Sequence, residues 1–208
     1  MTATQPAPAR SLHKVSSSLG FWKVHDPAIR TDLMSTILRT DMGWWLVDPA
    51  PVERRALDEF TGDGLRLLGI LLTNENHERD AAGLSQELGI PIHSHEAALG
   101  RMDLQPDFFF RDGEVLKGGV RVIHLPGATE GETCFCDERS GTLVMGDALI
   151  HLKKTGFTFL PDKYCRDPEQ SRKSLRSLLD RKFDVMAFAH GEPIMSGAKQ
   201  QLTELLQS

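Results

Sequence analysis

The most informative stretch of the sequence runs Leu71-Leu72-Thr73-Asn74-Glu75-Asn76-His77-Glu78-Arg79-Asp80-Ala81-Ala82-Gly83. An apolar run, Leu67 to Leu72, ends abruptly in seven polar residues, and a segment with helical character begins near Asp80. This pattern predicts a strand that delivers a polar loop to the N-terminus of a helix. Active sites are often built at such a point, because the strand fixes the loop and leaves its side chains free. We therefore treat this loop as the candidate functional site.

The composition is that of one ordinary globular domain. The chain has 208 residues, and we expect a disordered N-terminal tail over residues 1–11 and a single folded domain over residues 12–208. The net charge of −5 gives no basic surface, so we expect no nucleic-acid partner. No apolar run approaches the ~20 residues that span a bilayer, so we expect no membrane partner either. Three cysteines without a framework spacing favour a cytoplasmic location, and the sequence leaves the oligomeric state open.

Apolar periodicity and turn residues predict the order of the elements. The predicted strands are 34–39 with 44–47, 65–72, 90–93, 120–123, 133–136 with 142–145, and 184–189; the predicted helices are 52–60, 80–88, 167–182 and 196–207. Residues 149–166 read as one long loop, and Phe108-Phe109-Phe110 reads as a packing plug or pocket wall. The order predicts an α/β (α+β) fold with two sheets and helices outside them.

Five segments, in this order and spacing, resemble the metallo-β-lactamase-like hydrolases. They are Trp45-Leu46-Val47-Asp48-Pro49, Ile70-Leu71-Leu72-Thr73, Val122-Ile123-His124-Leu125-Pro126-Gly127, Leu143-Val144-Met145-Gly146-Asp147 and Phe188-Ala189-His190-Gly191-Glu192-Pro193. The resemblance extends from about Leu33 to the C-terminus and implies a four-layer αββα sandwich. It places the chain nearest the glyoxalase II-like and related small hydrolases. The wider group acts on thioesters, esters, lactams, lactones and phosphodiesters, and fold alone does not choose among them.

The resemblance also implies that most metal ligands are missing. In the family the loop reads Thr-His-x-His-x-Asp-His and holds two metal ions. The family's ligand positions fall here on Asn74, Asn76, Glu78, Arg79, Ala128, Asp147 and His190, of which only the last two match. Amide side chains are poor ligands for zinc, and alanine has no donor atom.

Arg79 indicates a metal-depleted site. A guanidinium is permanently charged and donates hydrogen bonds without accepting any, so it cannot ligate a metal. We hypothesise that Arg79 pairs with Glu78 and Asp147 in place of the metal, and that the chain holds no metal or other cofactor. The predicted ligand is an anionic small molecule bound by Asn74, Asn76, His77, Glu78 and Arg79, with Asp147 and His190 as the catalytic pair if any chemistry remains.

One alternative stays open, and with it the question of whether the chain is an enzyme. If His77 turned inward, then His77, Glu78, Asp147 and His190 would form a mononuclear metal site for an ester, thioester or lactone hydrolase. We expect His77 at the loop surface instead. His93-Ser94-His95 and Cys134-Phe135-Cys136 have spacings that also occur in metal sites, but we interpret both as structural. The acidic loop at Glu130 and Glu132 reads as solvated, or as a further anchor for Arg79.

Overall fold

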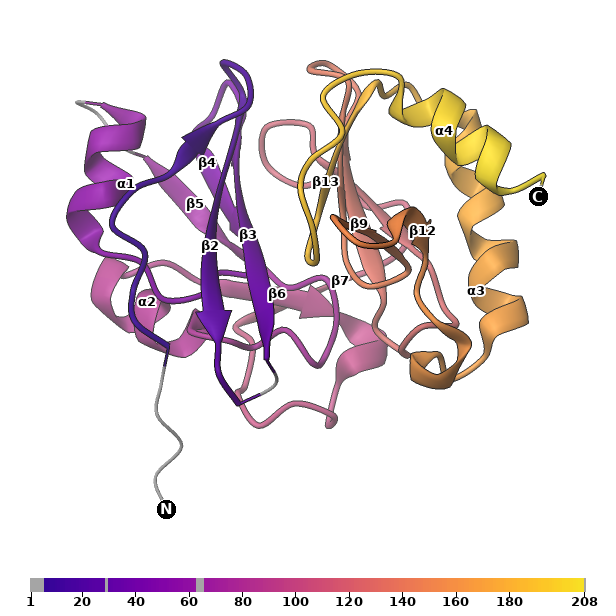
Figure 1. Cartoon of the computed structure of the whole chain (residues 1–208). Helices are drawn as coiled ribbons and strands as arrows, with labels where there is room; N and C mark the ends of the chain where they lie inside the picture. The colour runs from indigo at the N-terminus through magenta and orange to yellow at the C-terminus, as the bar shows by residue number, and fades with distance from the viewer. Residues whose placement is uncertain (1–5, 29, 63–65, 208) are drawn as a thin grey trace.

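The computed structural model describes residues 6–28, 30–62 and 66–207. Two sheets face each other, and helices cover both outer faces (Figure 1). The helices α1 (Arg54–Thr61) and α2 (Ala81–Leu88) lie outside the larger sheet, whereas α3 (Pro168–Leu175) and α4 (Ala198–Leu205) lie outside the smaller one. This arrangement confirms the predicted αββα sandwich.

The larger sheet has seven strands within the described residues, in the order β1-β2-β3-β4-β5-β6-β7. Their bounds are β1 His13–Lys14, β2 Leu19–Asp26, β3 Thr31–Arg39, β4 Trp44–Val47, β5 Leu67–Leu71, β6 Ile92–His95 and β7 Phe108–Phe110. The first four strands pair antiparallel, and the pairs from β4 to β7 are parallel. The parallel strands therefore bring their carboxyl ends to one edge, where loops can build a site.

The smaller sheet runs β13-β10-β9-β8, and a two-stranded ribbon lies beside it. The bounds are β8 Arg121–His124, β9 Thr133–Asp137, β10 Thr142–Met145 and β13 Val185–Phe188, with β11 Leu149–Leu152 and β12 Gly156–Phe159 in the ribbon. Three 3₁₀ turns among the described residues complete the chain: η1 Glu96–Ala98, η2 Asp162–Tyr164 and η3 Arg176–Asp180. The strands β10 and β13 are parallel, so their carboxyl ends also point to one edge.

Three apolar clusters fill the spaces between the four layers. Trp22, Leu57 and Leu84 belong to the cluster between the larger sheet and its helices. A second cluster, which includes Trp45 and Phe135, lies between the two sheets. The third lies between the smaller sheet and α3 and α4. Burial of these faces removes apolar side chains from water and is the main term that holds the layers together.

Two expectations from the sequence need correction. Ala9 forms a bridge with Val52, and Arg10 pairs with Glu53, so both belong to the folded part and not to a tail; residues 1–5 lie outside the described residues. The predicted loop 149–166 contains the β11–β12 ribbon and η2. The phenylalanine cluster forms the edge strand β7; Phe110 is buried between the sheets, and all three residues line a pocket of about 360 Å³, so the predicted pocket wall is confirmed.

None of the helices formed by the described residues combines the length and the apolar character that crossing a membrane requires.

Gly191 offers a test of the packing between the ribbon and β13. Its φ is +110°, and a Cβ at this position would strike the backbone of His151, with which Gly191 forms a bridge. Left-handed backbone and overpacking both carry a cost, so Gly191→Ala is expected to lower the free energy of unfolding by at least about 3 kcal/mol.

The matched control is Gly156→Ala, where φ is +70° but nothing lies within 4 Å of the added Cβ. It carries the backbone strain alone, about 1 to 2 kcal/mol. Urea unfolding measures both, and equal losses would contradict the contact described at Gly191.

Candidate functional site

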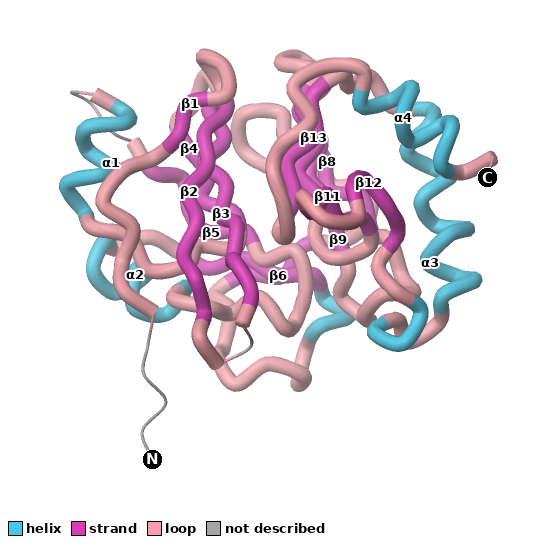
Figure 2. The backbone as a smooth tube through the Cα atoms, in the orientation of Figure 1, coloured by secondary structure: helices cyan, strands magenta, loops and turns pink. Residues whose placement is uncertain are grey.

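Four strands deliver polar side chains to the edge between the two sheets. Asp48 follows β4, the loop that begins at Thr73 follows β5, Asp147 follows β10 and His190 follows β13. The ribbon lies alongside, because His151 of β11 bridges Gly191 directly after β13 (Figure 2). The fold thus assembles at one place side chains that are far apart in the sequence.

His77 is the centre of this assembly, and the prediction that it lies at the loop surface was wrong. The residue is 4% exposed. The backbone N–H of Asn76 donates to the side-chain oxygen of Asn74 at 2.9 Å, and the N–H of His77 donates to the carbonyl of Asn74 at 3.3 Å. This local turn points Asn76 to solvent and His77 into the protein, which is an Asx-turn effect that the residue types alone do not fix.

Asp48 and Thr73 hold the His77 ring in one orientation. His77 Nδ1 lies 2.9 Å from Asp48 Oδ2 and 2.9 Å from Thr73 Oγ1. Thr73 itself donates its N–H and its hydroxyl to the Asp48 carboxylate. Since an ionised carboxylate can only accept, Nδ1 carries a proton. The other ring nitrogen, Nε2, then faces Asp147.

Three potential ligand atoms meet at this point. His77 Nε2 and His190 Nε2 each lie 3.3 Å from Asp147 Oδ1, and the three atoms lie within 4.8 Å of one another. Asp147 Oδ1 is buried, yet it has no hydrogen-bond partner of acceptable geometry. Two imidazole nitrogens therefore lie at ion-pair distance from this oxygen, and the three atoms together could hold a metal ion.

These three residues fit a single divalent metal ion. Neighbouring ligands around a tetrahedral zinc ion with ~2.0–2.1 Å bonds are about 3.4 Å apart, close to the two separations found here. Two imidazoles and one carboxylate also form the usual donor set of non-haem iron(II). The Asp48 carboxylate on the far nitrogen of His77 is the supporting contact that metal-bound histidines commonly have.

The other oxygen of Asp147 is held from the opposite side. Asn74 Nδ2 donates to Asp147 Oδ2 at 3.2 Å and to Glu132 Oε2 at 3.0 Å, and Glu132 Oε1 accepts the N–H of Ala148 at 2.9 Å. Burial, with the nearby charge of Asp147, raises the pKa of Glu132 to about 8. The sequence suggested that Glu132 belongs to a solvated loop, but the residue is fully buried.

Arg79 occupies a different place from the one predicted. Its guanidinium donates to the carbonyls of Met34, Asp48 and Ala189, which lie on both sheets, and it makes no ion pair with a carboxylate of the described residues. The expected pairing with Glu78 and Asp147 was wrong, because these three carbonyls take up the guanidinium instead. Arg79 still acts at short range as a buried positive charge.

Glu78 and Asn76 leave the site altogether. The Glu78 carboxylate accepts the N–H groups of Asp103 and Leu104 at 2.9 Å and 2.7 Å, and Asn76 is exposed. Of the predicted ligand-binding residues, Asn74 and His77 therefore join Asp147 and His190. Ala128 is buried and contributes no donor.

Electrostatics couple the buried groups tightly. Burial lowers the pKa of His77, but Asp147 and Asp48 on either side outweigh it and raise the pKa to about 10. Burial likewise opposes the ionised form of Asp48, yet His77 and Arg79 hold the pKa of Asp48 below its usual range. The pKa of Asp147 is also well below its usual range, because His77 and His190 outweigh burial. In the absence of metal, two buried cations thus balance two buried carboxylates.

A basic cleft of about 350 Å³ opens beside His190. It is lined by Lys23, His25, Arg30, Thr31, Asp32, Met34, His151, Leu152, Lys153, Lys154, Gly191 and Glu192. Two of its cations are satisfied locally, since Lys23 pairs with Glu192 and His25 with Asp32. Arg30, Lys153 and Lys154 have no carboxylate partner among the residues that the structure describes, so the cleft carries excess positive charge.

Comparison with known proteins gives the class that this fold and site define. The family described as "Metallo-beta-lactamase superfamily" matches residues 9–208, and the chain belongs to it. Hydroxyacylglutathione hydrolase of Francisella tularensis subsp. tularensis (strain WY96-3418) is 28% identical over 105 residues, which are 49% of this chain and 42% of the relative. YobT of Bacillus subtilis (strain 168), described as uncharacterized, is 30% identical over 121 residues, 54% of this chain and 47% of that protein. The chain thus aligns with about half the length of these relatives.

Solved structures agree on the fold. DIM-1 metallo-beta-lactamase superposes with a TM-score of 0.76 at 15% identity, over 98% of this chain and 99% of that chain. The metallo-beta-lactamase family protein TTHA1429 from Thermus thermophilus gives 0.68 at 23% identity, over 93% and 80%. At these identities the likeness establishes the fold alone.

The remaining histidine and cysteine signals lie outside the site. His93 packs edge to face against Trp45 and stacks on Phe108, and His95 stacks on His124 with ring centroids 4.0 Å apart. Cys134 and Cys136 are buried in strand β9. Within the described residues none of these joins a group of three potential metal ligands.

His95 gives the protein a predicted dependence of stability on pH. Its Nδ1 accepts the N–H of Ala97, and its Nε2 is buried without a partner. Burial and the neighbouring His124 lower the pKa of His95 to about 4, whereas in the unfolded chain a histidine takes up its proton near pH 6.5. The unfolded state therefore binds more protons between these values, and stability falls as the pH drops from about 6.5 to 4.

The control for this prediction is His95→Asn, which keeps an acceptor for Ala97 and removes the titration. Urea unfolding at several pH values should show a smaller loss between pH 6.5 and 4 in the variant than in the parent. Parallel losses in both proteins would show that His95 is not responsible.

Proposed function

We propose that the chain is a mononuclear metal-dependent hydrolase whose substrate is an anionic ester, thioester or lactone. The observation that carries the proposal is the convergence of His77 Nε2 and His190 Nε2 on Asp147 Oδ1, a buried carboxylate oxygen that accepts no hydrogen bond of good geometry. The positions of this loop where the family carries metal ligands hold Asn74, Asn76, Glu78 and Arg79. His77, from the same loop, supplies an imidazole ligand in their place. The expectation of a metal-depleted site depended on Arg79 pairing with Glu78 and Asp147 and on His77 lying at the surface. Arg79 instead donates to three carbonyls, and His77 is buried.

A metal ion bound by these three residues would supply a Lewis acid for the scissile carbonyl. Asp48 keeps the proton of His77 on Nδ1, so that the lone pair of Nε2 points to the shared position. Asn74 holds Asp147 Oδ2 and thereby leaves Oδ1 available. The charge of Arg79 helps to keep Asp48 ionised, which in turn keeps the tautomer of His77.

The basic cleft supports an anionic substrate. The sequence-based expectation of an anionic ligand depended on Arg79, but the Arg79 guanidinium donates its hydrogen bonds to three backbone carbonyls. Arg30, Lys153 and Lys154 supply the charge instead, and Gly191 places the cleft directly beside His190. Lysine and arginine side chains at such a rim attract a carboxylate or phosphate and orient the rest of the molecule. The name of the Francisella relative, a hydroxyacylglutathione hydrolase, supports hydrolysis as the reaction.

A second candidate, a metal-free binding protein, is favoured by one observation. The raised pKa of His77 makes it an imidazolium between Asp48 and Asp147 when no metal is present, and this charge balances the site without an ion. In that case the protein binds its anionic ligand in the basic cleft without hydrolysis.

Kinetics with matched substrates separate the two candidates. Protein stripped of metal and then reloaded with zinc, iron(II) or manganese is assayed on anionic and neutral versions of one thioester, one ester and one lactone. The hydrolase proposal predicts activity only after reloading, with a preference for the anionic version. Lack of activity with every metal and substrate, together with saturable binding of the anionic compounds, would favour the binding protein.

The contribution of the cleft is tested with Lys153→Gln combined with Lys154→Gln. Loss of two cations should raise KM for the anionic substrate about tenfold or more and leave the neutral substrate unchanged. Lys173→Gln with Lys182→Gln, both exposed and outside the cleft, is the control. An unchanged KM for the anionic substrate would remove the cleft from the proposal but not the metal site.

A further inference from the structure

One edge of the larger sheet exposes aromatic side chains. Strand β7 ends that sheet, and within the described residues it pairs with β6 on one side and with no strand on the other. Phe108 is 55% exposed and Phe109 is 36% exposed. A strand edge that combines unpaired backbone groups with large apolar side chains is a template for pairing with another strand.

The exposed apolar surface continues from β7 to the edge of the smaller sheet. Val115 is 52% exposed, and it bridges Arg121 of β8, the edge strand of that sheet. A pocket of about 360 Å³ lies between the two edges, and its walls include Trp45, Phe108 and Val115. Contiguous apolar surface of this kind marks an interaction site more often than scattered single side chains do.

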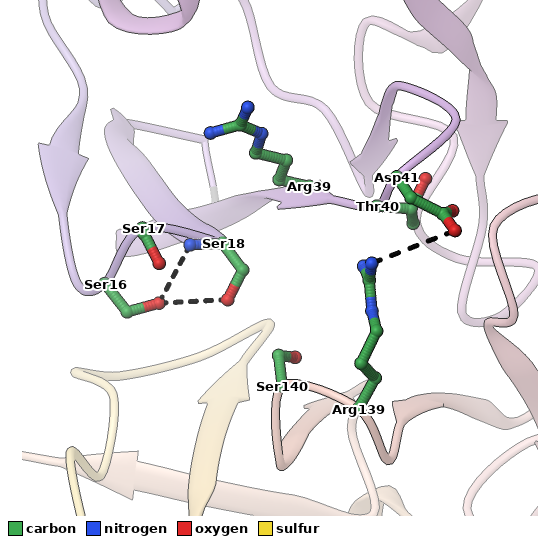
Figure 3. A pocket seen from close by; sticks show the side chains of 8 residues that line it. All are labelled: Ser16, Ser17, Ser18, Arg39, Thr40, Asp41, Arg139 and Ser140. Carbon is green, nitrogen blue, oxygen red and sulfur yellow. Dashed lines mark hydrogen bonds and ion pairs between the residues drawn. The ribbon is translucent and has the colours of Figure 1, made fainter.

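The opposite edge of the larger sheet is protected by polar groups. It is formed by β1, whose two residues, His13 and Lys14, are exposed. Serines occupy positions 16–18 in the turn that follows, and Arg139 pairs with Asp41 across the polar cavity beside this turn (Figure 3). Polar and charged side chains are the usual protection of a strand edge. Strand β7 consists of phenylalanine alone and has no such protection within the strand.

The charges that flank β7 indicate which partner the edge fits. The sequence reads Asp107-Phe108-Phe109-Phe110-Arg111. When this segment pairs antiparallel with a second copy about Phe109, Asp107 of each copy lies opposite Arg111 of the other, and the phenylalanines lie opposite one another. Parallel pairing in register would place like charges side by side, which is unfavourable. The segment is therefore complementary to itself in the antiparallel direction.

Both charged side chains keep atoms available for this contact. Arg111 binds Glu96 through Nε at 2.7 Å, and its Nη groups form no hydrogen bond within the part of the chain that the structure describes. Asp107 accepts the N–H of Ile92 through Oδ2 at 2.8 Å, and its Oδ1 accepts none from a described residue. The contacts within one chain can therefore persist while the two side chains meet those of a second copy.

We infer that this edge is the interface of a homodimer, in which β7 pairs antiparallel with β7 of a second copy and the two larger sheets join. The backbone hydrogen bonds and the flanking charges set the register, and Phe108, Phe109 and Val115 supply the apolar surface that leaves water. A twofold contact of this kind closes at two copies, because each copy uses the same edge. These residues lie outside the candidate metal site, so the inference does not depend on the proposed function.

Sedimentation velocity of the full chain over a series of concentrations tests the inference. The expected mass rises with concentration from the 23.1 kDa of one chain toward twice that value. Phe109→Glu places two carboxylates at the twofold axis and should weaken association at least about tenfold. Phe109→Leu keeps an apolar side chain and should still dimerise. A parent protein that keeps the mass of one chain at every concentration would overturn the inference, and so would equal association of the parent and Phe109→Glu.

Charge reversal tests the register of the two strands. Asp107→Arg places an arginine opposite Arg111 of the second copy, and this variant should associate at least about tenfold more weakly than the parent. Adding Arg111→Asp to the same chain restores opposite charges across the interface and should recover the dimer. Double and single variants that associate equally weakly would contradict the antiparallel register.

Cross-linking gives a readout that does not depend on weakened binding. In the proposed dimer the two Phe109 side chains lie opposite each other across the twofold axis, with Cβ atoms about 4.5–5.5 Å apart. Phe109→Cys should therefore form a disulfide-linked dimer under mild oxidation. His13→Cys, on the exposed edge strand β1, is the control, and the parent accounts for the native cysteines. Equal cross-linking of both variants would contradict the proposed interface.

Discussion

Replacing His77 by Gln is expected to reduce bound metal from about one ion per chain to background and to reduce hydrolysis by about 100-fold or more. Loss of residues that merely support a ligand costs 10- to 100-fold in metal affinity or activity, so loss of the ligand itself costs at least as much. The side-chain amide can still donate to Asp48, which keeps the loop in place. Metal analysis by mass spectrometry and the thioester assay measure the two effects.

His13→Gln is the matched control for this substitution, because His13 is exposed on β1 and far along the chain from the site. It should bind as much metal as the parent. Full metal content in His77→Gln would contradict the proposed role of His77, even if the activity of the variant were reduced.

Replacing Arg79 by Met is expected to lower the free energy of unfolding by about 3 to 5 kcal/mol. The substitution removes one of the two cations beside the Asp48 carboxylate, since His77 remains, and leaves the carbonyls of Met34 and Ala189 without this donor. Unsatisfied buried acceptors and the loss of a buried counter-charge are among the most destabilising changes in a protein. For a chain of this size the melting temperature should fall by roughly 6 to 20 °C.

Arg55→Met is the control, since Arg55 is exposed on α1 and pairs with Glu59 one turn away. It should leave the melting temperature unchanged. A similar small effect for both variants would show that the guanidinium of Arg79 does not join the two sheets in the way described. Arg79→Lys separates charge from geometry, because a lysine keeps the charge but cannot reach three carbonyls in different directions.

Much of the fold could be predicted from the sequence because its signals are local. Alternation and continuous apolar runs indicated strands such as β4 and β10, and their order with the flanking helices indicated the two-sheet sandwich. The β11–β12 ribbon was missed because its pairing brings together residues across a turn that has no strong apolar alternation. Ala9 was missed because its pairing partner, Val52, lies far along the chain.

The site was harder to predict, because it depends on which way a loop turns. Asp147 and His190 were found from the strands that carry them. His77 was placed at the surface because its neighbours Asn76 and Glu78 fall on ligand positions of the family pattern. The turn at Asn74 reverses this arrangement, since it points Asn76 to solvent and His77 into the protein. The position of Glu132 directly before the buried strand β9 was a usable signal that its side chain is buried.

Anomalous X-ray diffraction from crystals of the metal-loaded protein tests the central claim most directly. The account predicts one peak per chain at the absorption edge of the added metal, within coordination distance of His77 Nε2, Asp147 Oδ1 and His190 Nε2. Crystals that show no such peak, with His77 still paired between Asp48 and Asp147, would contradict it.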